Sequence, residues 1–351
     1  MNASLKQAQL QQVARLLGKT RTGTKSILSA RIAEALETSK PIAPGTRILS
    51  IDLGIRNLAY SLLEVPTTTS HEPPAAKLKK RQNKGSPATS AQSVKPILHT
   101  WERLALIPKT PAPVTSKKRK SAKAKKTRSE DPENHDDTPA ELPVDADKAT
   151  IPVIIEDFSP TRLSAVAVDL ILNRLLPLKP DIITLEQQRF RSMGGFGVYE
   201  WTLRVNSLES MLYAVFTTLQ RLGQWPGGRV EGVVARNVLE FMVLQEQIAG
   251  VDVGEIWGKD ADNKKVKKAI VGRMLGAEEG VSVGAAAEPV AREYLDVWHG
   301  KIKGQQKSER LKKLDDLADC LLQGIAFIRW QENKRKLMEG GVKALQDQMI
   351  E

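Results

Sequence analysis

The chain has 351 residues, 41% of them apolar, and a formal net charge of +12, which suits a protein with a substantial core and polyanionic partners. Its single cysteine, Cys320, excludes a disulfide framework and a cysteine-based zinc site. The four histidines are scattered without metal-ligand spacing, and no apolar run reaches the roughly 20 residues that a membrane-spanning helix needs. We therefore expect no membrane partner and a chemistry based on carboxylates.

The first 40 residues have the pattern of two short helices around a glycine turn. Leucine and valine recur at helical spacing up to Gly18, a turn and helix cap follow, and a second apolar stripe runs over 27–36. This hairpin resembles the SAP DNA-binding motif. The absence of any acid before Glu34 is also typical of a mitochondrial transit peptide, so residues 1–40 are interpreted as a SAP-like module, a presequence or both. The resemblance implies DNA contacts by the basic residues near the turn, Lys19, Arg21 and Lys25.

Strand patterns follow a short linker. The segment 47–54 is an apolar run that ends in an acid and a glycine, which predicts a buried strand. The segment 58–65 predicts a second strand, and the short turn before it predicts an antiparallel hairpin. Residues 97–106 predict a third strand. The stretches 66–96 and 107–150 are polar and poor in aromatic residues, which predicts two disordered insertions in the domain.

The second half of the chain alternates helix and strand patterns. Such alternation predicts an α/β domain, here extending over residues 45–335, with a helical tail over 336–351. The predicted helices cover about 160–176, 199–222, 262–275 and 308–330, and the predicted strands cover 181–186 and 230–234.

Acidic residues lie in or at the end of apolar elements at three places along the chain. Asp52 ends the first strand, Glu186 ends a later strand, and an apolar helix contains Asp315, Asp316 and Asp319. Two carboxylates on one helix face repel each other by about 1–4 kcal/mol, which a bound cation relieves. Carboxylate oxygens without histidine or cysteine suit Mg²⁺ or Mn²⁺, and two such ions clamp a phosphate for hydrolysis. Each acid alone also fits a cap, a turn or a solvated face, but their conjunction favours a metal site.

These acids occur in a recognisable order. The segment 50–59 holds a hairpin strand that ends in Asp, 186–192 begins with the Glu that ends a strand, and 315–319 is a late Asp-rich helix. In this order they resemble the RuvC-type nucleases of the RNase H-like superfamily, in particular the fungal mitochondrial Holliday junction resolvases. The resemblance implies an α/β fold with an RNase H-like mixed sheet flanked by helices, preceded by the small SAP-like helical module.

The same resemblance implies a set of catalytic metal ligands. Asp52, Glu186 and Asp319 match the family pattern directly. The fourth ligand is Asp316 if the helix uses i, i+3 spacing and Asp315 if it uses i, i+4 spacing, and the sequence leaves both open. Related enzymes that place a late histidine in this helix differ from this chain, which has none there.

The activity that the resemblance implies is the resolution of four-way DNA junctions by paired symmetric nicks. Two Mg²⁺ or Mn²⁺ ions per active site would give 5′-phosphate and 3′-hydroxyl ends. A homodimer would supply two matched sites, with the apolar face of a helix at 201–222 as one candidate for the interface. The expected location is the mitochondrial matrix, with the mitochondrial DNA.

The loop after Glu186 is a candidate DNA-binding loop. Its arginines can hold phosphates, its glycines allow close backbone approach, and a methionine or phenylalanine can insert between bases at a branch point. The alternative is a loop whose apolar side chains pack inward. The candidate contacts are Gln187, Arg189, Phe190, Arg191, Met193 and Phe196, together with Arg204 on the following helix.

Two other functions stay open at this point. An RNase H-like nuclease could instead act on RNA–DNA hybrids or flaps, because a fold does not determine its substrate. A SAP-type DNA-binding protein without catalysis is the second alternative, although acids at a DNA surface are costly without metal ions.

Overall fold

The computed structural model describes most of the chain, namely residues 5–67, 95–107, 157–188, 199–251, 262–303, 308, 311 and 313–349. It has two compact units, one of Met1–Leu106 and Phe158–Glu351 and one of Ile107–Asp157. All elements and contacts below belong to the first unit. The predicted insertions at 66–96 and 107–150 lie almost entirely outside the described residues. Within the described part of the chain, no helix is long and apolar enough to cross a membrane.

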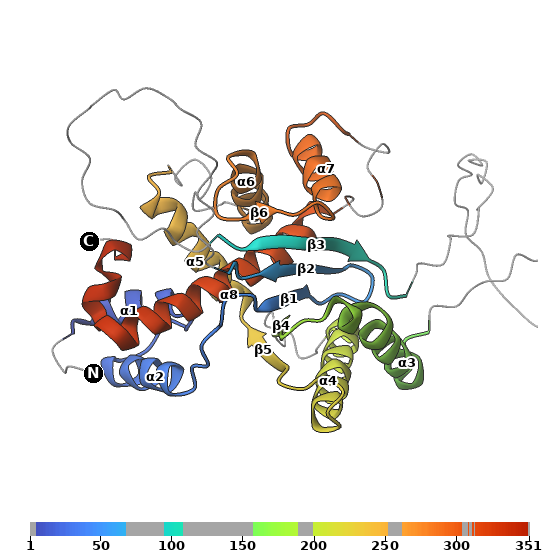
Figure 1. Cartoon of the computed structure of the whole chain (residues 1–351), viewed down its shortest axis with the longest axis horizontal. Helices are drawn as coiled ribbons and strands as arrows, with labels where there is room; N and C mark the ends of the chain where they lie inside the picture. The colour runs from blue at the N-terminus through green and yellow to red at the C-terminus, as the bar shows by residue number, and fades with distance from the viewer. Residues whose placement is uncertain are drawn as a thin grey trace, which may run out of the picture. The chain divides into compact units, whose positions relative to one another are not determined.

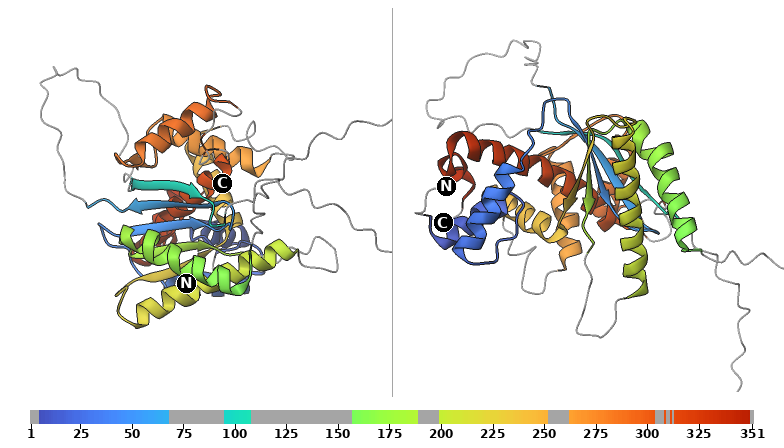
Figure 2. Two further views of the ribbon diagram at one scale, coloured as in Figure 1. Left: turned by 90° about the vertical axis from the view of Figure 1, so that its right-hand side faces the viewer. Right: turned by 90° about the horizontal axis from the view of Figure 1, so that it is seen from below.

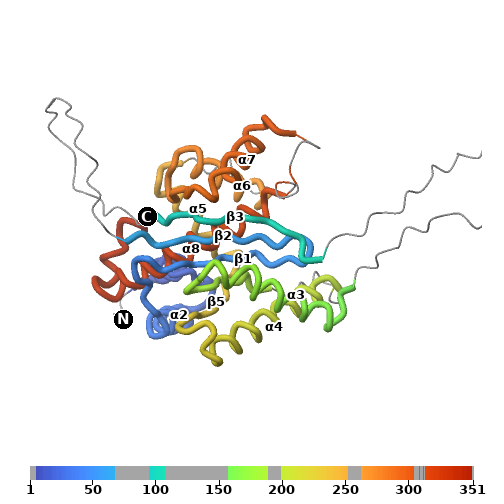
Figure 3. The backbone as a smooth tube through the Cα atoms, turned by 45° about the vertical axis from the view of Figure 1, so that its right-hand side comes forward, coloured from blue at the N-terminus to red at the C-terminus, as the bar shows by residue number. Residues whose placement is uncertain are grey.

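A mixed sheet forms the centre of this unit. Its six strands have the order β5-β4-β1-β2-β3-β6 (Figures 1 and 3). Strands β1, β2 and β3 pair antiparallel, β4 lies parallel to β1, and β5 lies parallel to β4. This order and these directions are those of the predicted RNase H-like fold. The strands are β1 (Arg47–Asp52), β2 (Leu58–Glu64), β3 (Ile97–Leu104), β4 (Ile182–Glu186), β5 (Arg229–Val233) and β6 (Ser282–Val283).

Helices cover both faces of the sheet. In Figure 2, α3 and α4 lie on one side of the strands, and α5 to α8 lie on the other. Successive side chains of a strand point to opposite faces of the sheet, and helices cover both faces. Six of the seven residues of β2 are therefore buried. The helices are α3 (Pro160–Leu170), continued by η1 (Ile171–Leu175) and η2 (Leu176–Leu178), α4 (Glu200–Arg221), α5 (Ala235–Ile248), α6 (Asn263–Gly276), α7 (Glu288–Trp298), α8 (Leu314–Gly340) and η5 (Val342–Gln348).

Two of these helices, α5 and α7, were not predicted from the sequence. Helix α5 is buried on almost every side, including Phe241, Met242, Val243 and Leu244 in succession, so it lacks the periodic polar face that identifies a surface helix. Helix α7 has a regular apolar stripe, which sequence analysis could have found. The middle of the apolar face of α4 packs inward, with Phe216 among the fully buried side chains, and a dimer contact on this helix stays a prediction.

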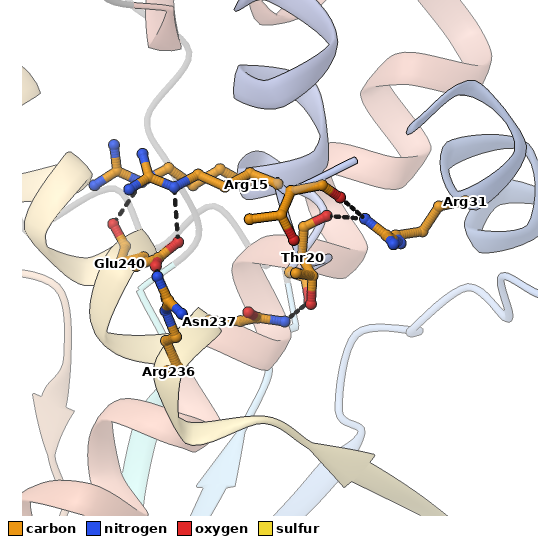
Figure 4. A network of polar contacts seen from close by, with 9 residues as sticks. Arg15, Thr20, Arg31, Arg236, Asn237 and Glu240 are labelled. Carbon is orange, nitrogen blue, oxygen red and sulfur yellow. Dashed lines mark hydrogen bonds and ion pairs between the residues drawn. The ribbon is translucent and has the colours of Figure 1, made fainter. Parts of the chain in front are cut away.

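The predicted N-terminal helical hairpin is present. Helices α1 (Gln7–Leu16) and α2 (Lys25–Glu37) place their apolar side chains in the same core cluster as α8. Asn333 donates a 2.9 Å hydrogen bond to the Leu16 carbonyl, and Asn237 donates one of 2.9 Å to the Gly18 carbonyl. On the same side, Arg15 reaches the backbone carbonyl of Glu240 at 2.6 Å (Figure 4). The hairpin is therefore fastened to α5 and α8, while its role as a SAP module stays a prediction.

Gly18 lies where the hairpin meets α8. Its φ of +71° favours glycine, and a Cβ there would come within 2.3 Å of the Trp330 indole. We expect Gly18→Ala to lower the free energy of unfolding by about 1–2 kcal/mol for the left-handed backbone plus about 1–3 kcal/mol for displacing the indole. Gly223→Ala is the matched control, because Gly223 has a φ of +69° with nothing within 4 Å. Equal losses of stability in chemical denaturation would show that the indole contact contributes nothing.

Candidate active site

Strand register places the first two predicted acids side by side. Strands β1 and β4 run parallel with Ile51 opposite Leu185, so the next residues, Asp52 and Glu186, are neighbours at the carboxyl ends of the strands. Because side chains alternate between faces, both acids share a face with Thr184, whose hydroxyl lies 3.2 Å from Gln323 of α8. The pair therefore lies on the side of the sheet that α8 covers.

Helix α8 presents the remaining acids at its first two turns. It is held against the sheet by Trp101, whose indole N–H donates to the Leu317 carbonyl at 3.0 Å, and by Ser61, whose hydroxyl donates to the Cys320 carbonyl at 3.1 Å. The same anchoring leaves Asp315, Asp316 and Asp319 partly buried, with side-chain exposures of 15%, 16% and 24%.

Electrostatics links the acids of the strands with those of the helix. Asp52 keeps some exposed surface, but its carboxyl group is surrounded by protein, and this burial raises its pKa well above the ordinary value. The nearby charges of Glu186, Asp319 and Asp316 raise it further, as does a side-chain hydrogen bond to Glu186. Two carboxyl groups that share a hydrogen bond need a proton or a cation between them, so this end of the sheet selects for positive charge.

Asp319 experiences the same repulsion. Burial raises its pKa to about 6, with further contributions from Glu186 and Asp315, although the positive charge of Lys267 acts in the opposite direction. The acids Asp52, Glu186, Asp315, Asp316 and Asp319 therefore interact electrostatically across two strands and one helix, and their role as metal ligands stays a prediction.

Each acid of α8 is paired with one basic side chain. Lys267 Nζ lies 2.5 Å from Asp319 Oδ1, and Lys264 Nζ lies 2.6 Å from Asp315 Oδ2, both lysines coming from α6. The third pair joins β3 to α8, with Arg103 Nε at 3.0 Å from Asp316 Oδ2. Sequence analysis missed these partners, because nothing local indicates that a lysine of α6 or an arginine of β3 faces an acid about 50 to 200 residues away.

The residues fit a divalent metal site by their chemistry. Hard carboxylate oxygens suit Mg²⁺ or Mn²⁺, and the charge they concentrate is what such an ion would neutralise. Among the described residues, no three acidic, histidine or cysteine side chains lie as a ready group around one point, since the acids of α8 are turned to their basic partners. A small cavity of about 10 Å³, close to the size of one water, is lined by Glu186, Asp319, Lys267, Gln323 and apolar residues of α5 and α8.

The residues predicted to contact DNA differ in their exposure and in their partners. Lys25 is exposed and Lys19 is half-buried, whereas Arg21 pairs with Glu240 of α5 at 3.2 Å. Arg204 pairs with Glu200 and lies over the ring of Phe158. Gln187 extends the pairing of β4 with β5 through its backbone N–H, which donates to the Val233 carbonyl at 2.8 Å. The remaining candidates, Arg189, Phe190, Arg191, Met193 and Phe196, lie outside the described residues.

The ion pair between Lys267 and Asp319 can be tested without DNA. We expect Lys267→Met to lower the free energy of unfolding by about 2–3 kcal/mol in metal-free buffer, because it leaves Asp319 uncompensated among other acids. Added Mg²⁺ should then raise the melting temperature of this variant more than that of the wild type. Lys301→Met is the control, since Lys301 pairs with Asp296 at the surface, with 68% of its side chain exposed, and should cost less than about 1 kcal/mol. An equal rise in the melting temperatures of all three proteins with Mg²⁺ would contradict the placement of Asp319 in a metal site.

Comparison with known proteins identifies the family of this chain. The model of the family described as "Mitochondrial resolvase Ydc2 / RNA splicing MRS1" matches residues 48–337. The chain is 28% identical to the mitochondrial cruciform cutting endonuclease 1 of Schizosaccharomyces pombe over 213 residues, which is 61% of this chain and 56% of that protein. The match thus spans little more than half of that relative. The crystal structure of the yeast mitochondrial Holliday junction resolvase Ydc2 is similar with a TM-score of 0.53 and 21% identity, over 97% of this chain and 98% of that one, which supports the fold.

Proposed function

The chain belongs to the family described as mitochondrial resolvase Ydc2 / RNA splicing MRS1, and from this premise we propose that it is a Mg²⁺-dependent endonuclease that resolves four-way DNA junctions. The observation that carries the proposal is the strand register, which puts Asp52 beside Glu186 on the side of the sheet where α8 brings the charges of Asp316 and Asp319 close. A protein that only binds DNA has no need of such a cluster, because it repels the phosphate backbone.

In this proposal the acids hold two divalent ions at the carboxyl ends of β1 and β4. Ions held there would supply activation of a water and neutralisation of the leaving 3′ oxygen, the chemistry that gives 5′-phosphate and 3′-hydroxyl ends. Asp52, Glu186 and Asp319 serve as ligands. We propose Asp316 as the fourth, because its charge contributes to the raised pKa of Asp52, and Arg103 would have to release it for a metal ion. Lys267 would turn from Asp319 to a DNA phosphate once the ions neutralise the acids.

Two further parts of the proposal concern assembly and location. Paired symmetric nicks in a four-way junction require two active sites related by a two-fold axis, so we propose a homodimer. A mitochondrial location follows from the names of the family and of the fission yeast relative. We also propose that residues 5–38 are retained in the folded protein, because their removal would uncover the apolar surface of α8 around Trp330. That this hairpin binds DNA is proposed from its resemblance to the SAP motif.

Asp52→Asn and Glu186→Gln test the metal site. Each removes a ligand charge while conserving shape, so we expect junction cutting in Mg²⁺ to fall by at least about a thousandfold. Junction affinity in Ca²⁺ should stay within about tenfold of wild type, because phosphate contacts dominate it. Glu102→Gln is the matched control: Glu102 also lies on a strand, but it accepts a 2.7 Å hydrogen bond from Tyr60 on the opposite face, and cutting should persist.

The substrate is tested by comparing four-way junctions with RNA–DNA hybrids, flaps, structured RNA and plain duplexes at one ionic strength. The proposal predicts two symmetric nicks in the junction and little cutting of the others. Preferred cutting of hybrids or flaps would favour the alternative nuclease, and binding without metal-dependent cutting would favour a DNA-binding or RNA-splicing role. Wild-type cutting by Asp52→Asn would remove that residue from the metal site.

A further inference from the structure

Arg103 lies in the same row of the sheet as two acids of the candidate site. The register pairs Asp52 of β1 with Ala59 of β2, and Ala59 with Arg103 of β3, while Glu186 is the neighbour of Asp52 on β4. Residues directly opposite one another in a sheet point to the same face, so Arg103 shares the face of the two acids. At about 4.8 Å per strand, the Cα atoms of Arg103 and Asp52 are about 10 Å apart, with only the methyl group of Ala59 between them.

Arg103 contacts α8 and the β1–β2 turn at the same time. Its Nε lies 3.0 Å from Asp316 Oδ2, and it also donates a hydrogen bond to the side-chain carbonyl of Asn57. Only 11% of the Arg103 side chain and 16% of the Asp316 side chain are exposed. The guanidinium is therefore enclosed between the turn that follows Asp52 and the helix that carries Asp316.

This burial limits what Arg103 can do when a metal ion takes Asp316. A charge that is largely removed from water destabilises the protein strongly when its partner is withdrawn. Asn57 is neutral, so its amide cannot replace the charge of Asp316, and the acids of the strands would be committed to the same ions. The anion that remains for the guanidinium is a DNA phosphate at the site, and the planar fork of arginine suits phosphate oxygens.

We propose that Arg103 exchanges Asp316 for a DNA phosphate when a divalent ion binds the site, so that metal and DNA bind cooperatively. The proposal rests on the function proposed above and assigns it a phosphate-binding residue. In the metal-free protein, Arg103 neutralises Asp316 and is closed to DNA. In the metal-bound protein, it contributes one phosphate contact. Because the two binding equilibria are linked, metal strengthens DNA binding by the same factor by which DNA strengthens metal binding.

The test measures the affinity for a four-way junction with and without metal, in Ca²⁺ so that the junction is not cut and in EDTA. We expect Arg103→Gln to bind within about threefold of wild type in EDTA but about tenfold more weakly in Ca²⁺, because one charge-assisted contact is lost. The slope of log affinity against log salt should differ between the two proteins by about 0.9 in Ca²⁺ and should be equal in EDTA. Arg103→Lys keeps the charge without the planar fork and should keep part of the Ca²⁺ effect.

Lys264→Gln is the matched control. Lys264 also pairs with an acid of α8, Asp315, at 2.6 Å, but 64% of its side chain is exposed, so water can replace this partner. It should change the junction affinity by the same factor in EDTA and in Ca²⁺. An equal factor in both buffers for Arg103→Gln would overturn the inference, because a residue that only supports the fold predicts that result.

Asp316→Asn tests the exchange without metal. It withdraws the partner of Arg103, so the junction affinity in EDTA should rise, and combining it with Arg103→Gln should remove that rise. Asp315→Asn deletes the same charge, and its gain should persist in the Arg103→Gln background. Melting temperatures show whether each variant is folded, and the double variant, with its charges balanced, serves where Arg103→Gln alone is unfolded. A gain from Asp316→Asn that survives Arg103→Gln would contradict the exchange.

The two proposals fail in distinguishable ways. If wild-type protein cuts junctions but Arg103→Gln weakens binding equally in both buffers, the exchange is wrong and the proposed function stands. If wild-type protein neither binds nor cuts junctions, the proposed function is wrong. The exchange is then judged by the same comparison on a plain duplex, where a loss confined to Ca²⁺ supports it and an equal effect, or no binding, rejects it.

Discussion

Repulsion between acids at the carboxyl ends of β1 and β4 is the constraint on which the rest of the site depends. Asp52 and Glu186 are forced together by strand register, and α8 adds Asp316 and Asp319 from the same side. Like charges in a partly buried site destabilise a fold unless cations accompany them. Lys267 and Arg103 supply part of that positive charge, and the divalent ions of the proposed site would supply the rest.

Hydrogen bonds from the sheet and from α8 hold these acids in place. Helix α8 cannot slide along the sheet, because Gln323 donates hydrogen bonds to the carbonyls of Ile51 and Thr184, one residue before Asp52 and two before Glu186. Trp101 and Ser61 hold the same helix from β3 and β2. Buried hydrogen bonds of this kind have few alternative partners, so they determine the distance between the helix acids and the strand acids.

Helix α5 connects the two parts of the chain that the proposal assigns to DNA. Val238 and Leu239 line the cavity beside Glu186 and Asp319. From the same helix, Asn237 and Glu240 hold the N-terminal hairpin, and Arg236 pairs with Glu240 at 2.8 Å (Figure 4). A single helix thus contacts the acidic site along one side and the hairpin along the other, which keeps the two regions proposed to contact DNA at a constant separation.

Sequence patterns alone identified the acids and the order of most elements, because alternating apolar strands and carboxylates at strand ends are local features. It also indicated the helical hairpin, through Gly18 and the leucines around it. The folded chain was needed to show which basic side chains face the acids, that Arg21 pairs with Glu240, and that Arg56 and Phe158 contact Trp201. These contacts join residues far apart in the chain, and their geometry follows from sheet register and helix packing, which no local pattern encodes.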